Sequence, residues 1–334
     1  MMPFALVAAI VVGAGLISWL GTGALIPLLR RRAVLDRPNE RSLHQIPTPR
    51  GGGIAVVAAI IVAWWALTRL GLLPRPAAPI LIGALILAAV SWVDDLRGLP
   101  AAVRLAVQLV AIGLVLRAGL LSGLVLQGFL APDLDGIVTA VLWLWFVNLF
   151  NFMDGIDGLA GSEAAAIGAG LLLFAIVGIG QNPGLAALAA AIVAAAGGFL
   201  VWNWAPARIF LGDVGSVPLG YLLGFLLLDQ AARGHWKLAL ILPLYFLADA
   251  TITLLRRLAR GERIWEGHRG HFYQGAVKRG FGHAAVTESV IAADLVLVGC
   301  AWVTENGWPS PGLAVAGAAV LLLLGWMAAA PVRR

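Results

Sequence analysis

The sequence is poor in charge and in cysteine, and each shortage excludes a class of protein. Charged residues make up 12% of the 334-residue chain and hydrophobic residues 61%, whereas a typical soluble domain carries about 25% charged residues. Mean hydropathy is +0.93. The single cysteine, Cys300, excludes an intrachain disulfide and a structural metal site built from thiolates. This composition predicts a polytopic membrane protein.

The apolar runs favour helices. Glycine, proline and short polar stretches interrupt them, whereas a membrane barrel shows alternating segments of roughly 10 residues. The first run lacks a basic region before it and is too long for a cleavable signal, so it is predicted to be a membrane span. We predict an all-α protein with one transmembrane domain over residues 1–334. About eleven spans are expected, near 4–29, 52–71, 79–93, 103–122, 137–152, 163–180, 185–202, 216–231, 237–256, 286–304 and 312–330.

Lysine and arginine are unevenly distributed between the two sides of this arrangement. Of the 23 basic residues, eighteen fall on one side and five on the other, and the excess marks the cytoplasmic side. The N-terminus is then outside and the C-terminus cytoplasmic. Because the isoelectric point near 10.4 reflects this topology, no nucleic-acid partner is expected. The cytoplasmic loops, at about 30–51, 94–102, 153–162, 203–215 and 257–285, hold all the polar motifs, so the predicted active site faces the cytoplasm.

Five aspartates end apolar runs on this side, without matching lysines. A carboxylate at bilayer depth costs about 2.5–3.5 kcal/mol, so it is read first as functional. We expect a cation to complete the site. Asp94 and Asp95 are adjacent, so on a helix one can bind the cation while the other takes a second role; the alternative is a solvated helix-end pair bound to Arg97 or Arg104. The five are Asp94, Asp95, Asp154, Asp157 and Asp213.

Asn148, Asn151, Asp154 and Asp157 recur every three residues. On a helix this spacing produces a polar stripe along one face, and Gly155 would let a ligand approach the backbone. The alternative is that the asparagines form hydrogen bonds between membrane helices.

Asp213 lies in the short turn FLGDVGS between two spans. There it can reach Mg²⁺ while backbone N–H groups face a phosphate. The alternative is a helix cap formed by Asp213 or Ser216.

Histidines and arginines supply candidate phosphate ligands. His268, Arg269 and His271 stand in the segment HRGHFYQ of the longest basic loop, where phosphate binding fits better than zinc because further metal ligands are lacking. His44 and Arg50 flank the prolines before a glycine triplet and can hold a phosphate. The alternative for both segments is a basic loop that only touches anionic lipid. Asp249, inside a predicted span, is a secondary candidate.

Together these motifs resemble the polyprenyl-phosphate N-acetylhexosamine-1-phosphate transferases, which are glycosyltransferase 4-like membrane enzymes. The resemblance covers most of the chain. Each motif alone is unspecific, but five in order are highly specific: TPRGGG at 48–53, VDDLRG at 93–98, NLFNFMDGIDGLAGS at 148–162, FLGDVGS at 210–216 and HRGHFYQ at 268–274.

The resemblance implies a reaction and roles for these residues. A UDP-N-acetylhexosamine gives its sugar-1-phosphate to undecaprenyl phosphate at the bacterial inner membrane, and UMP is released, with Mg²⁺ (or Mn²⁺) as cofactor. Asp94 and Asp95 match the family's paired catalytic aspartates, which hold the metal or deprotonate the lipid phosphate, and Asp213 matches its metal ligand. The substrate-binding residues implied are Asn148, Asn151, Asp154, Asp157, His268, Arg269, His271, His44 and Arg50.

The histidine segment separates this chain from one branch of the family. The peptidoglycan-precursor branch has a run of adjacent histidines, whereas HRGH resembles the branch that initiates O-antigen and capsule. This makes a muramoyl-pentapeptide substrate the alternative within the family. A transporter of an anionic solute is the rival from another class; a scaffold would leave the motifs without a cause, and the signature of CDP-alcohol phosphotransferases is absent from the sequence. The oligomeric state stays open, with a homodimer as one option.

Overall fold

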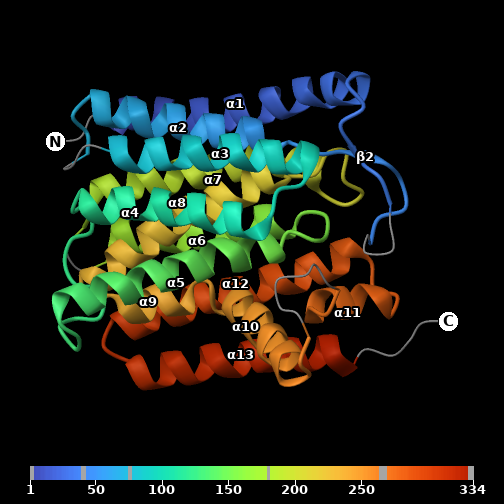
Figure 1. The fold of residues 1–334 in the computed structure, drawn as a ribbon. Coiled ribbons are helices and arrows are strands. Elements are labelled where there is room, and N and C mark those ends of the chain that lie inside the picture. The colour runs from blue at the N-terminus through green and yellow to red at the C-terminus, as the bar shows by residue number, and fades with distance from the viewer. Residues whose placement is uncertain (1–3, 39–42, 74–76, 179–180, 263–268, 330–334) are drawn as a thin grey trace.

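The computed structural model describes residues 4–38, 43–73, 77–178, 181–262 and 269–329, and it is almost entirely helical (Figure 1). Most of the helices run side by side along one axis, and α1 and α13 lie at opposite faces of the bundle. The elements are α1 (Phe4–Arg31), β1 (Leu35–Asp36), β2 (Thr48–Pro49), α2 (Gly53–Arg69), α3 (Ala78–Arg97), α4 (Ala101–Arg117), α5 (Pro132–Phe152), α6 (Leu159–Val177), α7 (Pro183–Asn203), α8 (Asp213–Ala232), α9 (Trp236–Ile241), α10 (Leu244–Ala259), α11 (Phe272–Lys278), α12 (His283–Glu305) and α13 (Pro309–Ala329).

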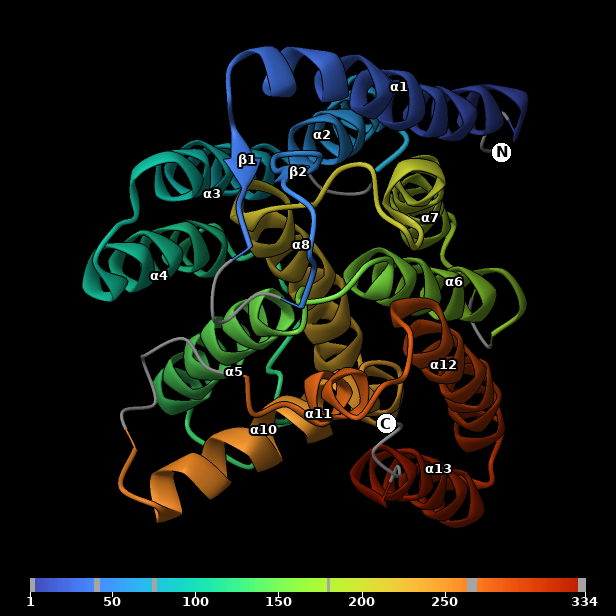
Figure 2. The same cartoon turned by 90° about the vertical axis from the view of Figure 1, so that its right-hand side faces the viewer.

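The predicted all-α polytopic membrane fold is confirmed, but the count of eleven spans is not. Among the described residues, eight helices are long and apolar enough to cross a membrane, and α2 is a shorter apolar helix. The predicted span 237–256 is two helices, α9 and α10, which Leu242 and Pro243 separate. Proline lacks the N–H that a continuous helix needs, and α10 leaves the bundle axis at this point (Figures 1 and 2).

Helix α8 lies at the centre of the bundle, surrounded by the other long helices (Figure 2). Most of its residues are buried within the protein. Tyr221 connects it to two neighbours: its hydroxyl donates to the carbonyl of Ala111 on α4, and its own carbonyl accepts a hydrogen bond from the Trp143 indole on α5. The Trp143 and Tyr221 rings also stack, with centroids 5.0 Å apart. Hydrogen bonds of this kind associate helices where the surroundings are apolar.

Two of the sequence motifs pair through their backbones at one end of the bundle. The N–H groups of Gly51 and Gly52 donate to the carbonyl of Phe210, and Phe210 donates to the carbonyl of Pro49. Gly53 packs against Gly215 so closely that a Cβ atom on Gly53 would clash with the Gly215 backbone. The glycine triplet therefore brings the β1–β2 segment directly against the N-terminus of α8.

Candidate active site

A polar cavity of about 290 Å³ lies where the β1–β2 segment, the turn after α5 and the N-terminus of α8 meet. Figure 2 views this end of the bundle, with β1, β2 and α11 facing the reader. Four of the five sequence motifs contribute to its wall. Six predicted site residues line it: His44, Arg50, Asn151, Asp154, Asp157 and Asp213.

Asp95 is buried beneath this cavity and holds the N-terminus of α8. Its two carboxylate oxygens accept the backbone N–H groups of Asp213 and Val214, each at 3.0 Å. These N–H groups belong to the first turn of a helix and have no partner within it. The Asp95 side chain is only 1% exposed, so the helix cap that the sequence placed on Asp213 or Ser216 comes instead from Asp95 on α3.

Two arginines surround Asp213. One nitrogen of Arg50 lies 2.6 Å from Asp213 Oδ1 and 2.7 Å from Asp95 Oδ1. Arg104 lies 3.2 Å from Asp94 Oδ2 and 3.9 Å from Asp213 Oδ2. Burial opposes the charge of Arg50, but the carboxylates of Asp213 and Asp95 outweigh it and raise the pKa of Arg50. Arginine cations thus hold three aspartates together.

Asp94 faces a different space from Asp95. Asp94 lines a narrow slot of about 20 Å³ between α3, α4, α5 and α8, together with Arg104 and Asp213. Its other oxygen accepts the N–H of Leu99. Asp213 lines both this slot and the larger cavity, so the two spaces adjoin at this residue.

Asp154 adds a further carboxyl group to the cavity, in the turn after α5. Burial raises the pKa of Asp154 well above its ordinary value, and the negative charges of Asp213 and Asp95 raise it further, with Arg50 opposing them. Asp154 therefore carries its charge readily only when more positive charge is close by. Oxygen ligands suit a hard divalent cation such as Mg²⁺, so the chemistry of this donor set fits the predicted metal.

The predicted sharing of one ion by Asp94, Asp95 and Asp213 is not seen in this arrangement. Among the described residues, no three His, Cys, Asp or Glu side chains form a group that could hold a metal ion. Mg²⁺ usually keeps several waters and takes only one or two protein carboxylates together with substrate phosphates. Asp213 and Asp154, which face the open cavity, are better placed for this than the enclosed Asp95.

The two asparagines of the predicted stripe face different partners. Asn151 donates to the hydroxyl of Ser216 at 2.8 Å and lines both spaces. Asn148 donates to Gln108 on α4 at 2.7 Å and to the Leu144 carbonyl, so it connects helices, and it also lines the slot. Asp157, at the end of the motif, accepts the N–H of Ala207 at 3.0 Å.

The histidine segment reaches the cavity through its helix. His271 is almost fully buried and its Nδ1 lies 3.1 Å from Asp249 Oδ1, and neither His271 nor Arg269 is among the residues that line the cavity. Instead, Gln274 on α11 lines it, and the Tyr273 hydroxyl donates to the carbonyl of Phe152. His268 lies outside the described residues.

Asp249 and His283 are functional candidates that the sequence treated as secondary or missed. Asp249 is fully buried and accepts the N–H groups of Phe272 and Tyr273, the first residues of α11. His283 lines the cavity from the N-terminus of α12. A charge inside an apolar run marks Asp249 in the sequence, whereas nothing local distinguishes His283.

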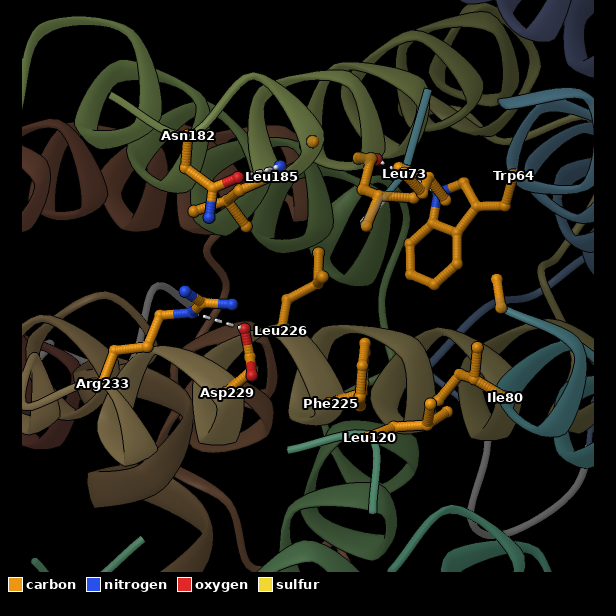
Figure 3. Close-up of a pocket in the computed structure, with 13 residues that line it drawn as sticks. Trp64, Leu73, Ile80, Leu120, Asn182, Leu185, Phe225, Leu226, Asp229 and Arg233 are labelled. Atoms are coloured by element: carbon orange, nitrogen blue, oxygen red, sulfur yellow. Dashed lines mark hydrogen bonds and ion pairs between the residues drawn. The ribbon is translucent and has the colours of Figure 1, made fainter. Parts of the chain in front are cut away.

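A second space, of about 70 Å³, lies toward the other end of α8 and offers little chemistry (Figure 3). Leucine, isoleucine, phenylalanine and tryptophan side chains make up most of its wall, and an ion pair in it joins Asp229 to Arg233 at 2.9 Å. Asp229 also accepts from the backbone and hydroxyl of Ser122. Its polar groups are thus already paired with each other and with the backbone.

Comparisons with known proteins are in accord with an active site in the polar cavity of about 290 Å³. Residues 77–231 match the family model described as glycosyl transferase family 4. A probable undecaprenyl-phosphate N-acetylglucosaminyl 1-phosphate transferase of Bacillus subtilis is 28% identical over 82% of this chain and 79% of that protein. A putative glycosyltransferase of Streptomyces coelicolor is 32% identical over 92% and 74%.

A third relative comes from the peptidoglycan branch. The phospho-N-acetylmuramoyl-pentapeptide-transferase of Mycolicibacterium gilvum is 31% identical over 65% of this chain and 73% of that protein. The expected family is thereby confirmed. The relatives support a multi-pass bacterial membrane enzyme and disfavour the alternative hypothesis of a transporter. The chain belongs to the polyprenyl-phosphate N-acetylhexosamine-1-phosphate transferases, the membrane enzymes of glycosyl transferase family 4.

Proposed function

We propose that this enzyme transfers N-acetylhexosamine-1-phosphate from a UDP-N-acetylhexosamine to undecaprenyl phosphate and so initiates a cell-surface polysaccharide. The observation that carries the proposal is Asp213, which lies between Arg50 and Arg104 where the two spaces meet. Phosphoryl transfer requires mainly positioning and neutralisation of charge, and carboxylates for a cation beside guanidinium groups for phosphates supply both. The name of the Bacillus subtilis relative, an undecaprenyl-phosphate N-acetylglucosaminyl 1-phosphate transferase, supports the same acceptor and an N-acetylglucosamine donor.

Mg²⁺, or Mn²⁺ in its place, is proposed to bind at Asp213, with Asp154 as the second carboxylate. Bound there, the ion would supply charge stabilisation for the diphosphate and the departing nucleotide. Once Asp213 is neutralised in this way, the guanidinium groups of Arg50 and Arg104 can donate to phosphate oxygens. Arginine binds phosphate through its planar, forked donors.

The two spaces suggest separate places for the two substrates. The larger cavity, with Asp154, Asp157 and His44, is proposed to hold the nucleotide sugar. The narrow slot, with Asp94 and Arg104, is proposed to hold the phosphate of the lipid. Asp94 would then accept its proton, and an oxygen of the lipid phosphate would attack the sugar-linked phosphorus while the bond to UMP breaks.

The proposed orientation in the membrane rests on the position of this cavity. UDP-sugars are water-soluble and the cavity end carries the arginine-rich segments, so it is proposed to face the cytoplasm, with the N-terminus outside and the C-terminus inside. The relatives favour a wall polymer over an O-antigen or capsule as the product pathway. We retain a homodimer as the proposed oligomeric state.

A reconstituted transfer assay tests the function. The purified enzyme in lipid nanodiscs is incubated with undecaprenyl phosphate, Mg²⁺ and, one at a time, UDP-N-acetylglucosamine, UDP-N-acetylgalactosamine and UDP-N-acetylmuramoyl-pentapeptide. UMP and the lipid-linked product are measured by mass spectrometry. We expect UMP and a diphosphate-linked sugar with an N-acetylhexosamine donor, and none with Asp213→Asn. Absence of UMP with every donor contradicts the proposal, and sole use of the muramoyl donor replaces it by the alternative.

A further inference from the structure

His283 lies in the larger cavity and belongs to none of the five motifs. It is the first residue of α12, and its side chain is 16% exposed. It faces Asp157, at the end of the turn that follows α5. Helix α12 holds this turn at a second point, because the hydroxyl of Thr287 donates to the carbonyl of Asp157 at 2.9 Å. Two residues at the N-terminus of α12, His283 and Thr287, thus contact Asp157 and fix its position.

One nitrogen of His283 faces two different groups of the same residue. Nδ1 lies 3.2 Å from the Asp157 carboxylate oxygen Oδ1 and 3.4 Å from the Asp157 backbone nitrogen. A nitrogen that carries a proton can donate to the carboxylate but cannot accept the N–H. A nitrogen with a free lone pair can accept the N–H but cannot bind the carboxylate. The two contacts therefore exclude one another, and the protonation of Nδ1 decides between them.

We propose that His283 is a positioning residue for the nucleotide-sugar end of the cavity, which acts by holding Asp157. The inference rests on the proposed function. With Nδ1 unprotonated, His283 holds the backbone of Asp157. Oδ2 of the carboxylate keeps the N–H of Ala207, and Oδ1 can accept a hydrogen bond from an N–H or O–H group of the donor. With Nδ1 protonated, the carboxylate is engaged by the imidazole instead. In this proposal the neutral imidazole carries its proton on Nε2, which leaves Nδ1 free, whereas the imidazolium carries a proton on both nitrogens. Histidine is the side chain whose charge changes near neutral pH, so donor affinity should fall as the medium becomes more acidic.

Asp157 is the charged group that His283 contacts in the cavity. Among the described residues, Asp157 is the one charged group recorded in contact with it. The other walls contribute uncharged Asn203 and Gln274. The remaining charged or titratable residues that line the cavity are Asp36, His44, Arg50, Asp154 and Asp213. None of them is changed in the variants tested below, so their effect on the bound donor is common to the variants and the wild type.

The chain supplies its own matched control. His235 forms the same kind of pair with Glu305, at 2.6 Å. Glu305 ends α12 and His283 begins it, so the two pairs lie about 33 Å apart at a rise of about 1.5 Å per residue. A substitution at His235 removes a histidine–carboxylate pair without touching the cavity.

The test compares His283→Asn, His283→Phe and His235→Asn with the wild type. KM for UDP-N-acetylglucosamine, KM for undecaprenyl phosphate and kcat are measured in nanodiscs between pH 5.5 and 8. Asparagine keeps a polar group near the position of Nδ1 but does not titrate, and phenylalanine fills the space without polar atoms. Thermal unfolding checks that each variant is folded.

In the wild type and in His235→Asn we expect KM for the donor to rise as pH falls, with KM for the lipid unchanged. His283→Asn should show a clearly weaker dependence. His283→Phe should raise the donor KM at pH 8 on the order of tenfold, which is the scale of one lost hydrogen bond, while kcat changes little. A His283→Asn enzyme with the wild-type pH dependence, or a His283→Phe enzyme with an unchanged donor KM, overturns the inference.

Failure of the proposed function is separable from failure of this inference. Binding of UDP-N-acetylglucosamine without undecaprenyl phosphate is measured by calorimetry at pH 6 and pH 8, and it does not require turnover. If the wild type releases no UMP but binds the donor more weakly at pH 6, and His283→Asn shows a clearly smaller change, the role of His283 stands while the reaction is wrong. Absence of donor binding by the wild type contradicts both.

Discussion

Substitutions at Asp95 should separate its structural contribution from the chemistry of its neighbours. Replacement by alanine removes the acceptor for two N–H groups at the start of α8, and the loss of such a cap costs about 0.5–2 kcal/mol. It also removes one charged partner of Arg50. A hydrogen bond to a charged group is worth roughly 1.5–3 kcal/mol, but Arg50 is about one-third exposed and keeps Asp213, so its share is smaller. We expect Asp95→Ala to lose about 2–4 kcal/mol of stability.

Asparagine at the same position should lose about half as much, because it retains one acceptor oxygen. Asp213→Asn should unfold near the wild-type temperature, because Arg50 keeps Asp95, yet it should lose transferase activity. Thermal unfolding in nanodiscs, followed by tryptophan fluorescence, gives the order of stability, and UMP release gives the activity. An Asp95→Ala protein that unfolds at the wild-type temperature would refute the cap, and a fully active Asp213→Asn enzyme would remove the metal role of Asp213.

Three further predictions address the metal, the packing and the reaction path. Because burial and neighbouring aspartates raise the pKa of Asp154, protons should compete with Mg²⁺ there: the Mg²⁺ concentration for half-maximal UMP release should rise as pH falls, and Asp154→Asn should lessen that change. Gly53→Ala should abolish activity and lower the unfolding temperature, since the new methyl would clash with Gly215; Gly197→Ala, where no atom lies within 4 Å, is the matched control, and equal behaviour of the two would contradict the close approach. Direct attack by the lipid predicts that labelled UMP does not exchange into the UDP-sugar without undecaprenyl phosphate, whereas exchange would indicate a covalent aspartyl intermediate.

The helices and the gathering of the motifs could be predicted from the sequence, because both follow from local patterns. Hydropathy places the long helices within a few residues of their observed bounds, and the sorting of basic residues places the polar motifs together at one end of the bundle. The interruption at Pro243 was missed because the hydropathy of residues 237–256 remains high through it. A proline inside such a run is a local signal for the break between α9 and α10.

The division of labour between neighbouring residues could not be predicted, because it depends on partners far away in the chain. Asp94 and Asp95 are equivalent in the sequence, yet Asp95 caps α8, 118 residues ahead, while Asp94 faces the slot beside Arg104. Likewise, a three-residue spacing placed Asn148 and Asn151 in one stripe. Gln108 on α4 engages Asn148, and Ser216 on α8 engages Asn151.

The arginines explain how an acidic site can fold in apolar surroundings before any substrate arrives. Several carboxylates this close would repel one another strongly, and Arg50 offsets that repulsion by binding Asp95 and Asp213 through one nitrogen. Of the two carboxylates that bind Arg50, Asp95 is buried and Asp213 is more exposed. A cation delivered with the diphosphate would therefore compete with Arg50 for Asp213 and leave the Asp95 pair intact. The cap on α8 would persist while the arginine gains a phosphate to bind, so substrate entry would exchange one charge pair for another without unfolding the helix end.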